Sequence, residues 1–287
     1  MEPTRISEHV YFVEGAAGIA TFNAGFTSNA AFVVTGNGVV VFDALGTPAL
    51  GAKLLDTIRS VTDEPVRLLY ISHYHADHMY GAQVFDEMDV EIIAPDGAVL
   101  YLSGETWWTR LVERRTSLSP WIGEDTRLAL PDRYLEEVET FNMGDVDFRA
   151  VNLGSAHSEG DLALFVETDR VLLSGDVIFR GRIPLLGSAN SGAWLDILDD
   201  LSRSGVTAIV PGHGSPGENP EETIEFTREY LIFVRDAMRD AVENWIPFDE
   251  AYEAVDWSDY YEYPAFLEAN RRNAYSVYLS LEQESLK

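Results

Sequence analysis

Hydrophobic and polar positions change their period several times along the chain, which predicts alternating strands and helices. Residues 31–43 form two runs of apolar, mostly β-branched residues around a Gly-Asn-Gly turn, a pattern typical of a β-hairpin. Thr47 and Pro48 then match the N-cap and first position of a helix, predicted over 48–60. The other predicted strands are 66–71, 91–94, 146–152, 161–167, 170–174 and 208–210, and the other helices 76–85, 191–204, 221–245 and 264–284. This alternation predicts a layered α/β fold.

Two stretches stand outside the regular alternation. Residues 96–122 read as a helical excursion that carries three tryptophans. Residues 221–287 form a C-terminal helical part. Neither is separated from the rest by a low-complexity or Gly/Ser-rich linker, so we expect residues 1–287 to form a single domain.

Composition narrows the chemistry of the chain. No cysteine is present, so disulfides and thiolate-bound zinc are excluded, and any metal must be held by histidines and carboxylates. The formal charge of -28, with lysine only at Lys53 and Lys287, argues against nucleic acid as a partner. Without a secretory signal or an apolar stretch of about 18 residues, we expect a soluble, cytoplasmic protein that makes no membrane contact.

Five of the six histidines occupy three short segments at the predicted ends of strands. The densest runs from Ser72 to His78, directly after the strand 66–71. In an extended segment, His73 and His75 point the same way and can bind one ion. Asp77 and His78 begin the next helix and turn toward a second position. A metal site explains this spacing far better than a polar loop that happens to contain three histidines.

Three more segments repeat this design. His157 lies between two predicted strands, Asp176 follows a strand through Gly175, and His213 follows a strand and a tight turn. Each would be weak evidence alone, but their recurrence at one strand end after another indicates a shared site. His9 lies outside these segments, and we expect it to be a surface or packing histidine.

Together these residues resemble the metallo-β-lactamase superfamily, whose signature is HxHxDH followed by a His, an Asp and a His at separated strand ends. The resemblance covers about residues 9–216. It implies a four-layer αββα sandwich with C-terminal helices. It also implies two metal sites: a first zinc on His73, His75 and His157, a second on Asp77, His78 and His213, and Asp176 bridging both.

The implied activity is hydrolysis by a hydroxide that bridges two zinc ions, although iron or manganese would also accept these donors. Asp77 would orient the attacking group and pass its proton to the leaving group. Asp43 is a candidate partner for a ligand histidine, or simply a carboxylate that precedes a helix. True β-lactamases generally lack an aspartate at the position of Asp176. We therefore expect a small-molecule ester, thioester or lactone as substrate, with β-lactam amides as the alternative.

Substrate contacts are harder to assign. Trp107, Trp108 and Trp121 are candidates for a substrate wall, although they would equally well pack helices or form a dimer contact. Tyr74, and less strongly Tyr80, would donate a hydrogen bond to an oxyanion. For a glutathione thioester the sequence offers only the Arg271–Arg272 pair as a carboxylate clamp, and a solvated helix face explains that pair better.

Two other enzyme classes fit part of the pattern. A nuclease of the same superfamily would need a basic groove, which the charge disfavours. A mononuclear iron dioxygenase would not need Asp77, His78 and His213 to hold a second metal, and metal analysis separates it from a dizinc hydrolase. A non-catalytic binding module explains seven such residues least well. The sequence leaves a homodimer open.

Overall fold

The computed structural model describes residues 1–88, 90–187 and 189–285. Within these ranges the strands form a seven-stranded sheet, in the order β1 to β7, and a five-stranded sheet, in the order β12-β11-β10-β9-β8. The first sheet contains β1 (Thr4–Arg5), β2 (Val10–Val13), β3 (Ala30–Val34), β4 (Val39–Phe42), β5 (Val66–Tyr70), β6 (Glu91–Pro95) and β7 (Arg133–Leu135). The second contains β8 (Val138–Met143), β9 (Val146–Gly154), β10 (Asp161–Val166), β11 (Val171–Phe179) and β12 (Ala208–His213).

Helices follow and cover these strands. They are α1 (Pro48–Val61), α2 (Ala76–Met79), α3 (Gln83–Asp86), α4 (Ala98–Ser103), α5 (Thr106–Ser117), α6 (Ser191–Ser202), α7 (Pro220–Glu243), α8 (Phe248–Ala254) and α9 (Phe266–Ser285). Short 3-10 turns, η1 (Ala20–Phe22) and η2 (Tyr80–Ala82), complete the described elements. No helix in the described ranges is long and apolar enough to span a membrane.

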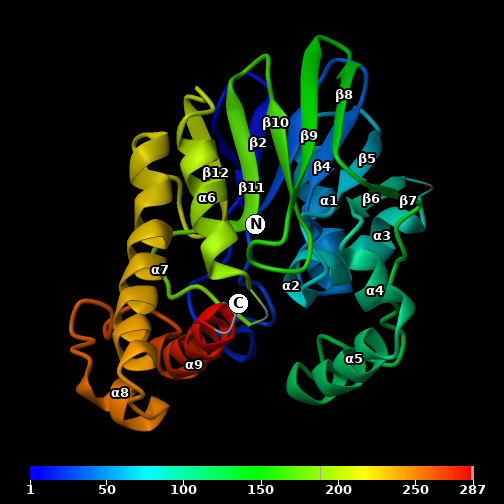
Figure 1. The fold of residues 1–287 in the computed structure, drawn as a ribbon. Helices are drawn as coiled ribbons and strands as arrows, with labels where there is room; N and C mark the ends of the chain where they lie inside the picture. The colour runs from blue at the N-terminus through cyan, green and yellow to red at the C-terminus, as the bar shows by residue number, and fades with distance from the viewer. Residues whose placement is uncertain (89, 188, 286–287) are drawn as a thin grey trace.

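Three apolar cores define four layers. One lies between the sheets, where Phe42 and Val33 of the first sheet meet Phe148 and Leu164 of the second. Another lies between the first sheet and helices α1 to α5, and the third joins the second sheet to α6, α7, α8 and α9. Figure 1 shows α6 and α7 on one flank of the paired sheets and α1 and α3 on the other. The predicted αββα sandwich with C-terminal helices is confirmed.

The hairpin and the helix after it form as the sequence predicts. β3 and β4 pair antiparallel around the Gly-Asn-Gly turn, with Ala31 opposite Phe42. Thr47 then caps α1 by accepting a hydrogen bond from the Leu50 amide at 3.1 Å, and Pro48 takes the first helical position. β4, β5 and β6 run parallel, so the segment after β5 emerges at the carboxyl edge of the sheet.

β11 differs from the prediction of a strand over 170–174. It runs on to Phe179, and every one of its residues is buried, so Asp176 lies within the strand and not after it. The reason is an interruption of the pairing with β12 at Gly175, whose φ of +55° lies in the left-handed region. A glycine there lets the strand bend and continue.

Other differences concern weak hydrophobic signals. The predicted helix 76–85 is divided into α2, η2 and α3. The sequence pattern did not predict β1, β2, β7, β8 and α8. β8 alternates between exposed and half-buried residues, so it offers no apolar face for a pattern to detect. The excursion 96–122 contains two helices, α4 and α5.

Candidate metal centre

Four of the predicted ligands converge on one point. His73 and His75 follow β5, His157 lies in the β9–β10 loop, and Asp176 lies in β11. Nε2 of His73 and Nε2 of His157 each lie 2.9 Å from His75 Nδ1. Asp176 Oδ2 lies 3.4 Å from His157 Nε2 and 3.8 Å from His73 Nε2. Two loops and one strand thus direct four donor atoms to a single position.

The other three ligands form a second group beside the first. Asp77 and His78 begin the short helix α2, and His213 ends β12. Asp77 Oδ2 lies 3.5 Å from His213 Nε2 and 3.9 Å from His78 Nε2. Asp176 also reaches this group, because its Oδ1 is 3.1 Å from His78 Nε2 and its Oδ2 is 3.3 Å from His213 Nε2. The carboxylate of Asp176 therefore stands between the two groups.

The donor atoms have the properties of metal ligands. His78 Nε2 and Asp176 Oδ1 are fully buried, and although they lie 3.1 Å apart, neither forms a hydrogen bond with any described residue. Buried polar atoms are rarely left unpaired, and a bound cation would satisfy both. One hydrogen on His75 Nδ1 cannot serve two imidazole nitrogens equally, whereas one ion would accept lone pairs from all three rings. Imidazoles with carboxylates are a donor set that suits zinc, so the residues present fit such an ion.

Neighbouring groups fix which nitrogen each histidine presents. Asp43 Oδ2 accepts from His78 Nδ1 at 2.7 Å and from Ser72 Oγ at 2.8 Å, so it confirms the partner role considered for Asp43. Because the Ser72 hydroxyl donates to Asp43, it can accept from His73 Nδ1, 3.0 Å away. Each Nδ1 therefore carries the hydrogen, and each Nε2 keeps its lone pair for a metal.

His213 is fixed in the same way by a loop that the sequence analysis did not single out. Its Nδ1 lies 2.7 Å from the carbonyl oxygen of Thr27, an atom that only accepts, so this nitrogen also carries hydrogen. The Thr27 hydroxyl donates to Asp77 Oδ2 at 3.0 Å. Asn29, two residues on, donates to the carbonyl oxygens of Pro211 and Gly214, each at 2.8 Å. No periodic pattern marks residues 23–29, which explains the omission.

Asp161 and Gly212 contribute to the positions of two further candidate ligands, His157 and Asp176. Asp161 accepts hydrogen bonds from the amides of Ala156 and Ser158, on either side of His157, at 3.1 and 2.9 Å. Burial raises the pKa of Asp161 to about 7 in spite of these bonds. At Gly212, any Cβ would collide with Asp176 Oδ1, so only glycine lets β12 pass this close to the carboxylate.

Burial and neighbouring charges give most of these residues their ligating form. Burial holds the pKa of His157 at about 3 and lowers that of His73, so both imidazoles are neutral. Burial alone would favour the neutral acid at Asp77, but His78 and His213 lower its pKa to about 2. His78 differs: despite burial, the carboxylates of Asp176, Asp43 and Asp77 raise its pKa well above the usual value. Three carboxylates thus create a demand for positive charge, which a metal ion would meet.

A cavity of about 160 Å³ opens beside the second group. Asp77 and Thr27 form part of its lining, and Ile19, Leu118 and Leu185 provide apolar surface. Asp77 is the ligand carboxylate that reaches this space, since its side chain is 28% exposed against 4% for Asp176. Two arginines, Arg114 and Arg182, also line the cavity. Neither arginine was predicted as a site residue, because no motif or spacing distinguishes it from other arginines in the sequence.

The predicted substrate residues lie outside that lining. Tyr74 is buried, stacks on Tyr101 with ring centroids 4.2 Å apart, and donates its hydroxyl hydrogen to Glu159. Tyr80 is buried in the core under the first sheet. Of the three tryptophans, Trp107 packs against the same core, and Trp108 and Trp121 are 49% and 42% exposed. Their roles toward a substrate stay predictions.

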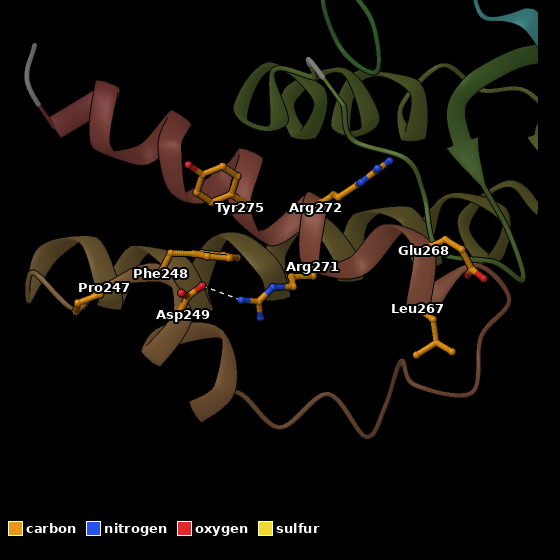
Figure 2. A pocket seen from close by; sticks show the side chains of 8 residues that line it. All are labelled: Pro247, Phe248, Asp249, Leu267, Glu268, Arg271, Arg272 and Tyr275. Atoms are coloured by element: carbon orange, nitrogen blue, oxygen red, sulfur yellow. Dashed lines mark hydrogen bonds and ion pairs between the residues drawn. The ribbon is translucent and has the colours of Figure 1, made fainter. Parts of the chain in front are cut away.

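A larger groove of about 680 Å³ lies between α8 and α9, and none of the seven candidate ligands lines it. Figure 2 shows Arg271 directed at Asp249, to which it donates at 2.7 Å, while Arg272 points away from that pair. The guanidinium of Arg271 also lies 5.3 Å from the ring centre of Phe248. The two arginines therefore do not form a joint clamp for carboxylates.

Comparison with known proteins identifies relatives of this arrangement. A sequence model of the Metallo-beta-lactamase superfamily matches residues 24–213, a range that contains all seven candidate ligands. A linear primary-alkylsulfatase from Pseudomonas sp. (strain ATCC 19151) is 23% identical over 76% of this chain and 48% of the sulfatase. An acyl-coenzyme A thioesterase from Gallus gallus is 28% identical over 51% of this chain and 56% of the thioesterase. The chain thus spans about half the length of these two relatives.

Solved structures show the same fold. A stereoselective inverting sec-alkylsulfatase from Pseudomonas sp. superposes with a TM-score of 0.73 at 16% identity, over 97% of this chain and 50% of the sulfatase. A metallo-beta-lactamase from Pontibacter korlensis gives a TM-score of 0.61 at 18% identity, over 80% of this chain and 98% of that protein. At such identities the likeness concerns the fold alone.

Proposed function

Because the chain belongs to the metallo-beta-lactamase superfamily, we propose that it is a hydrolase that holds two zinc ions and cleaves an ester, thioester or lactone. The observation that carries this proposal is the position of Asp176. Its two oxygens lie 3.1 to 3.4 Å from Nε2 of His78, His213 and His157. His157 belongs to the first candidate ligand group, and His78 and His213 belong to the second. A buried carboxylate shared in this way is suited to bridging two ions.

Zinc held there would lower the pKa of coordinated water and polarise the bond to be cleaved. The protein supplies orientation and proton transfer. Thr27 holds Oδ2 of Asp77, and this part-exposed carboxylate lines the cavity. Both observations support the proposal that Asp77 orients a nucleophile and carries its proton to the leaving group. Asp43 and Ser72 keep their histidines in the tautomer that can ligate.

The thioesterase among the relatives supports an acyl substrate. Metallo-beta-lactamases are also among them, and β-lactam amides are therefore the alternative substrate. An oxygenase with one iron would leave the convergence of Asp77, His78 and His213 unexplained. We retain Tyr74 as a proposed oxyanion donor, available once its bond to Glu159 opens, and the tryptophans as a proposed wall. We further propose a small-molecule substrate, a cytoplasmic location and one domain, since the C-terminal helices share a core with the second sheet.

Metal analysis followed by an activity panel tests the proposal. We expect two zinc ions per chain and turnover of an aryl ester, a thioester or a lactone. His75→Ala removes the nitrogen on which two other ligands converge, so hydrolysis should fall to background while the circular dichroism spectrum is retained. His9→Ala, a histidine paired with Asp169, is the matched control and should keep full activity. One iron per chain, cleavage of a cephalosporin alone, or an active His75→Ala protein would overturn the proposal.

A further inference from the structure

Arg182 is a buried cation near the carboxylates of Asp77, Asp176 and Glu268, which favour its charged form but do not form ion pairs with it in the described part of the chain. It follows β11 in the loop to α6, and only 4% of its surface is exposed. Among the described residues, its Nε has no hydrogen-bond partner. Burial lowers the pKa of Arg182, yet a guanidinium stays charged at neutral pH. An unpaired buried charge is costly and rare.

Arg182 has a single polar contact within the described ranges, and that contact does not compensate its charge. Its Nη1 lies 3.4 Å from His213 Nδ1. That nitrogen already carries a hydrogen directed at the carbonyl oxygen of Thr27, 2.7 Å away, so it cannot also accept one from Arg182. Among residues 1–88, 90–187 and 189–285, the guanidinium therefore has no acceptor for its hydrogens.

Arg114 brings a second cation to the same cavity. It belongs to α5, is half-buried, and forms no ion pair within the described part of the chain. Its neighbours Arg110 and Arg115 do pair, with Glu113 at 3.1 Å and Glu124 at 3.3 Å. In a chain with 48 acidic residues against 20 basic ones, two unpaired arginines in one cavity require an explanation.

The other residues that line the cavity indicate which kind of ligand would fit it. Glu268 also lines it but lies beyond ion-pair distance of both guanidinium groups. Ile19, Leu118 and Leu185 add apolar surface, and Asp77 marks the side of the metal centre. A ligand that satisfies all of these would have an anionic head and a short apolar body.

We propose that Arg182 and Arg114 bind an anionic oxyanion group of the substrate, a carboxylate or a sulfate, while its apolar part lies along Ile19, Leu118 and Leu185. Guanidinium groups recognise such planar or tetrahedral oxyanions through charge-assisted hydrogen bonds. The inference rests on the proposed function only in naming the bound molecule a substrate. It adds that the bond to be cleaved belongs to an anionic, short-chain compound.

Calorimetric binding to the metal-loaded protein tests this without turnover. The probes are hexanoate, hexyl sulfate and neutral 1-hexanol, which share one apolar body. The proteins are wild type, Arg182→Met, Arg182→Lys, Arg114→Met and the control Arg110→Met, from the same helix as Arg114. All keep the seven metal ligands, so any anion binding by the metals is constant.

We expect wild type to bind at least one anion about tenfold or more tightly than 1-hexanol. Arg182→Met should lose about tenfold for that anion and leave 1-hexanol unchanged, Arg114→Met should lose less, and Arg182→Lys should retain part of the preference. The favoured probe tells carboxylate from sulfate. If Arg182→Met fails to fold, the anion affinities of Arg114→Met and Arg182→Lys are compared with that of the control Arg110→Met, and a loss in the first two alone supports the proposal.

Equal affinity for the three probes in wild type, or a preference for anions that neither arginine substitution changes by more than twofold, would overturn the proposal. A preference that depends on Arg182 in a protein that hydrolyses no ester, thioester or lactone would leave the anion site standing and remove only the proposed function.

Discussion

Substitution of Asp43 by asparagine isolates the effect of one charge behind a metal ligand. Asp43 accepts three hydrogen bonds: from the Ser72 amide at 2.7 Å, the Ser72 hydroxyl at 2.8 Å and His78 Nδ1 at 2.7 Å. Its φ of +63° is a conformation that asparagine tolerates, so Asp43→Asn adds no backbone strain. If the amide oxygen keeps the Ser72 amide, the new NH₂ group must face two donors. His78 then loses its carboxylate, and the tautomer with hydrogen on Nε2 becomes competitive.

The size of the effect follows from this geometry. Loss of such an outer partner typically weakens metal binding about 10–100-fold. At about 1.36 kcal/mol per tenfold change, this corresponds to about 1.4–2.7 kcal/mol. The group of Asp77, His78 and His213 should lose most of it. His73, which reaches Asp43 only through Ser72, should lose less.

Competition with a chromophoric zinc chelator measures this change, and the chain supplies a matched control. Asp169 also accepts hydrogen bonds from a serine hydroxyl, a backbone amide and a histidine Nδ1, the last two at 2.9 and 2.7 Å from His9. It lies outside the metal centre, so Asp169→Asn should leave zinc affinity unchanged. Affinities within twofold of wild type for Asp43→Asn, or equal losses in the two variants, would refute the reasoning.

Three other perturbations have defined outcomes. Gly175→Ala places a Cβ 2.5 Å from Ser72 Cβ, at a left-handed φ that costs about 1–2 kcal/mol. Urea unfolding should therefore show a lower free energy of unfolding, and metal analysis should find less bound zinc. Unchanged unfolding would contradict this. Trp194→Phe removes the indole N–H that donates to the buried Val177 carbonyl oxygen at 2.8 Å. The free energy of unfolding, measured by denaturant titration, should fall by about 1–3 kcal/mol. A midpoint equal to that of wild type would show that the bond contributes nothing. Chelation should lower the thermal midpoint in calorimetry and added zinc should restore it, because a ligand at a hundred times its Kd adds about 2.7 kcal/mol; identical midpoints would count against a metal bound to the folded state.

The convergence of the seven candidate ligands could be predicted because each one lies beside a strong local signal. His73 and His75 follow an apolar strand directly, and their spacing of two residues places both on one side of extended backbone. His157 and His213 adjoin strands whose apolar residues are unmistakable. The predicted strand over 170–174 was too short, and Asp176 lies within β11 and not after it, although Gly175, which marked its position in the sequence, is where the pairing with β12 is interrupted.

Residues that act from irregular segments escaped prediction. Thr27 supports two ligands from a loop, through one carbonyl oxygen and one hydroxyl, and no periodicity identifies such a residue. Arg182 is of interest because it is buried without an ion pair to any described residue. Burial and the absence of an ion pair depend on three-dimensional packing, so a sequence pattern does not reveal them. Asp43 lay between these cases: its position before a helix was visible, but the choice between a helix-preceding carboxylate and a histidine partner required the distance to His78.

The seven candidate ligands are divided between the two sheets: four follow β5 of the first sheet, and three belong to β11, β12 and the β9–β10 loop of the second. An ion held by them would therefore crosslink two layers that pack together through the apolar core around Phe148 and Phe42. Metal affinity and adhesion of the sheets would then be linked equilibria. A cavity made between the sheets, far from any ligand, would then weaken metal binding, and the metal-loaded protein would tolerate interior substitutions that the metal-free protein does not.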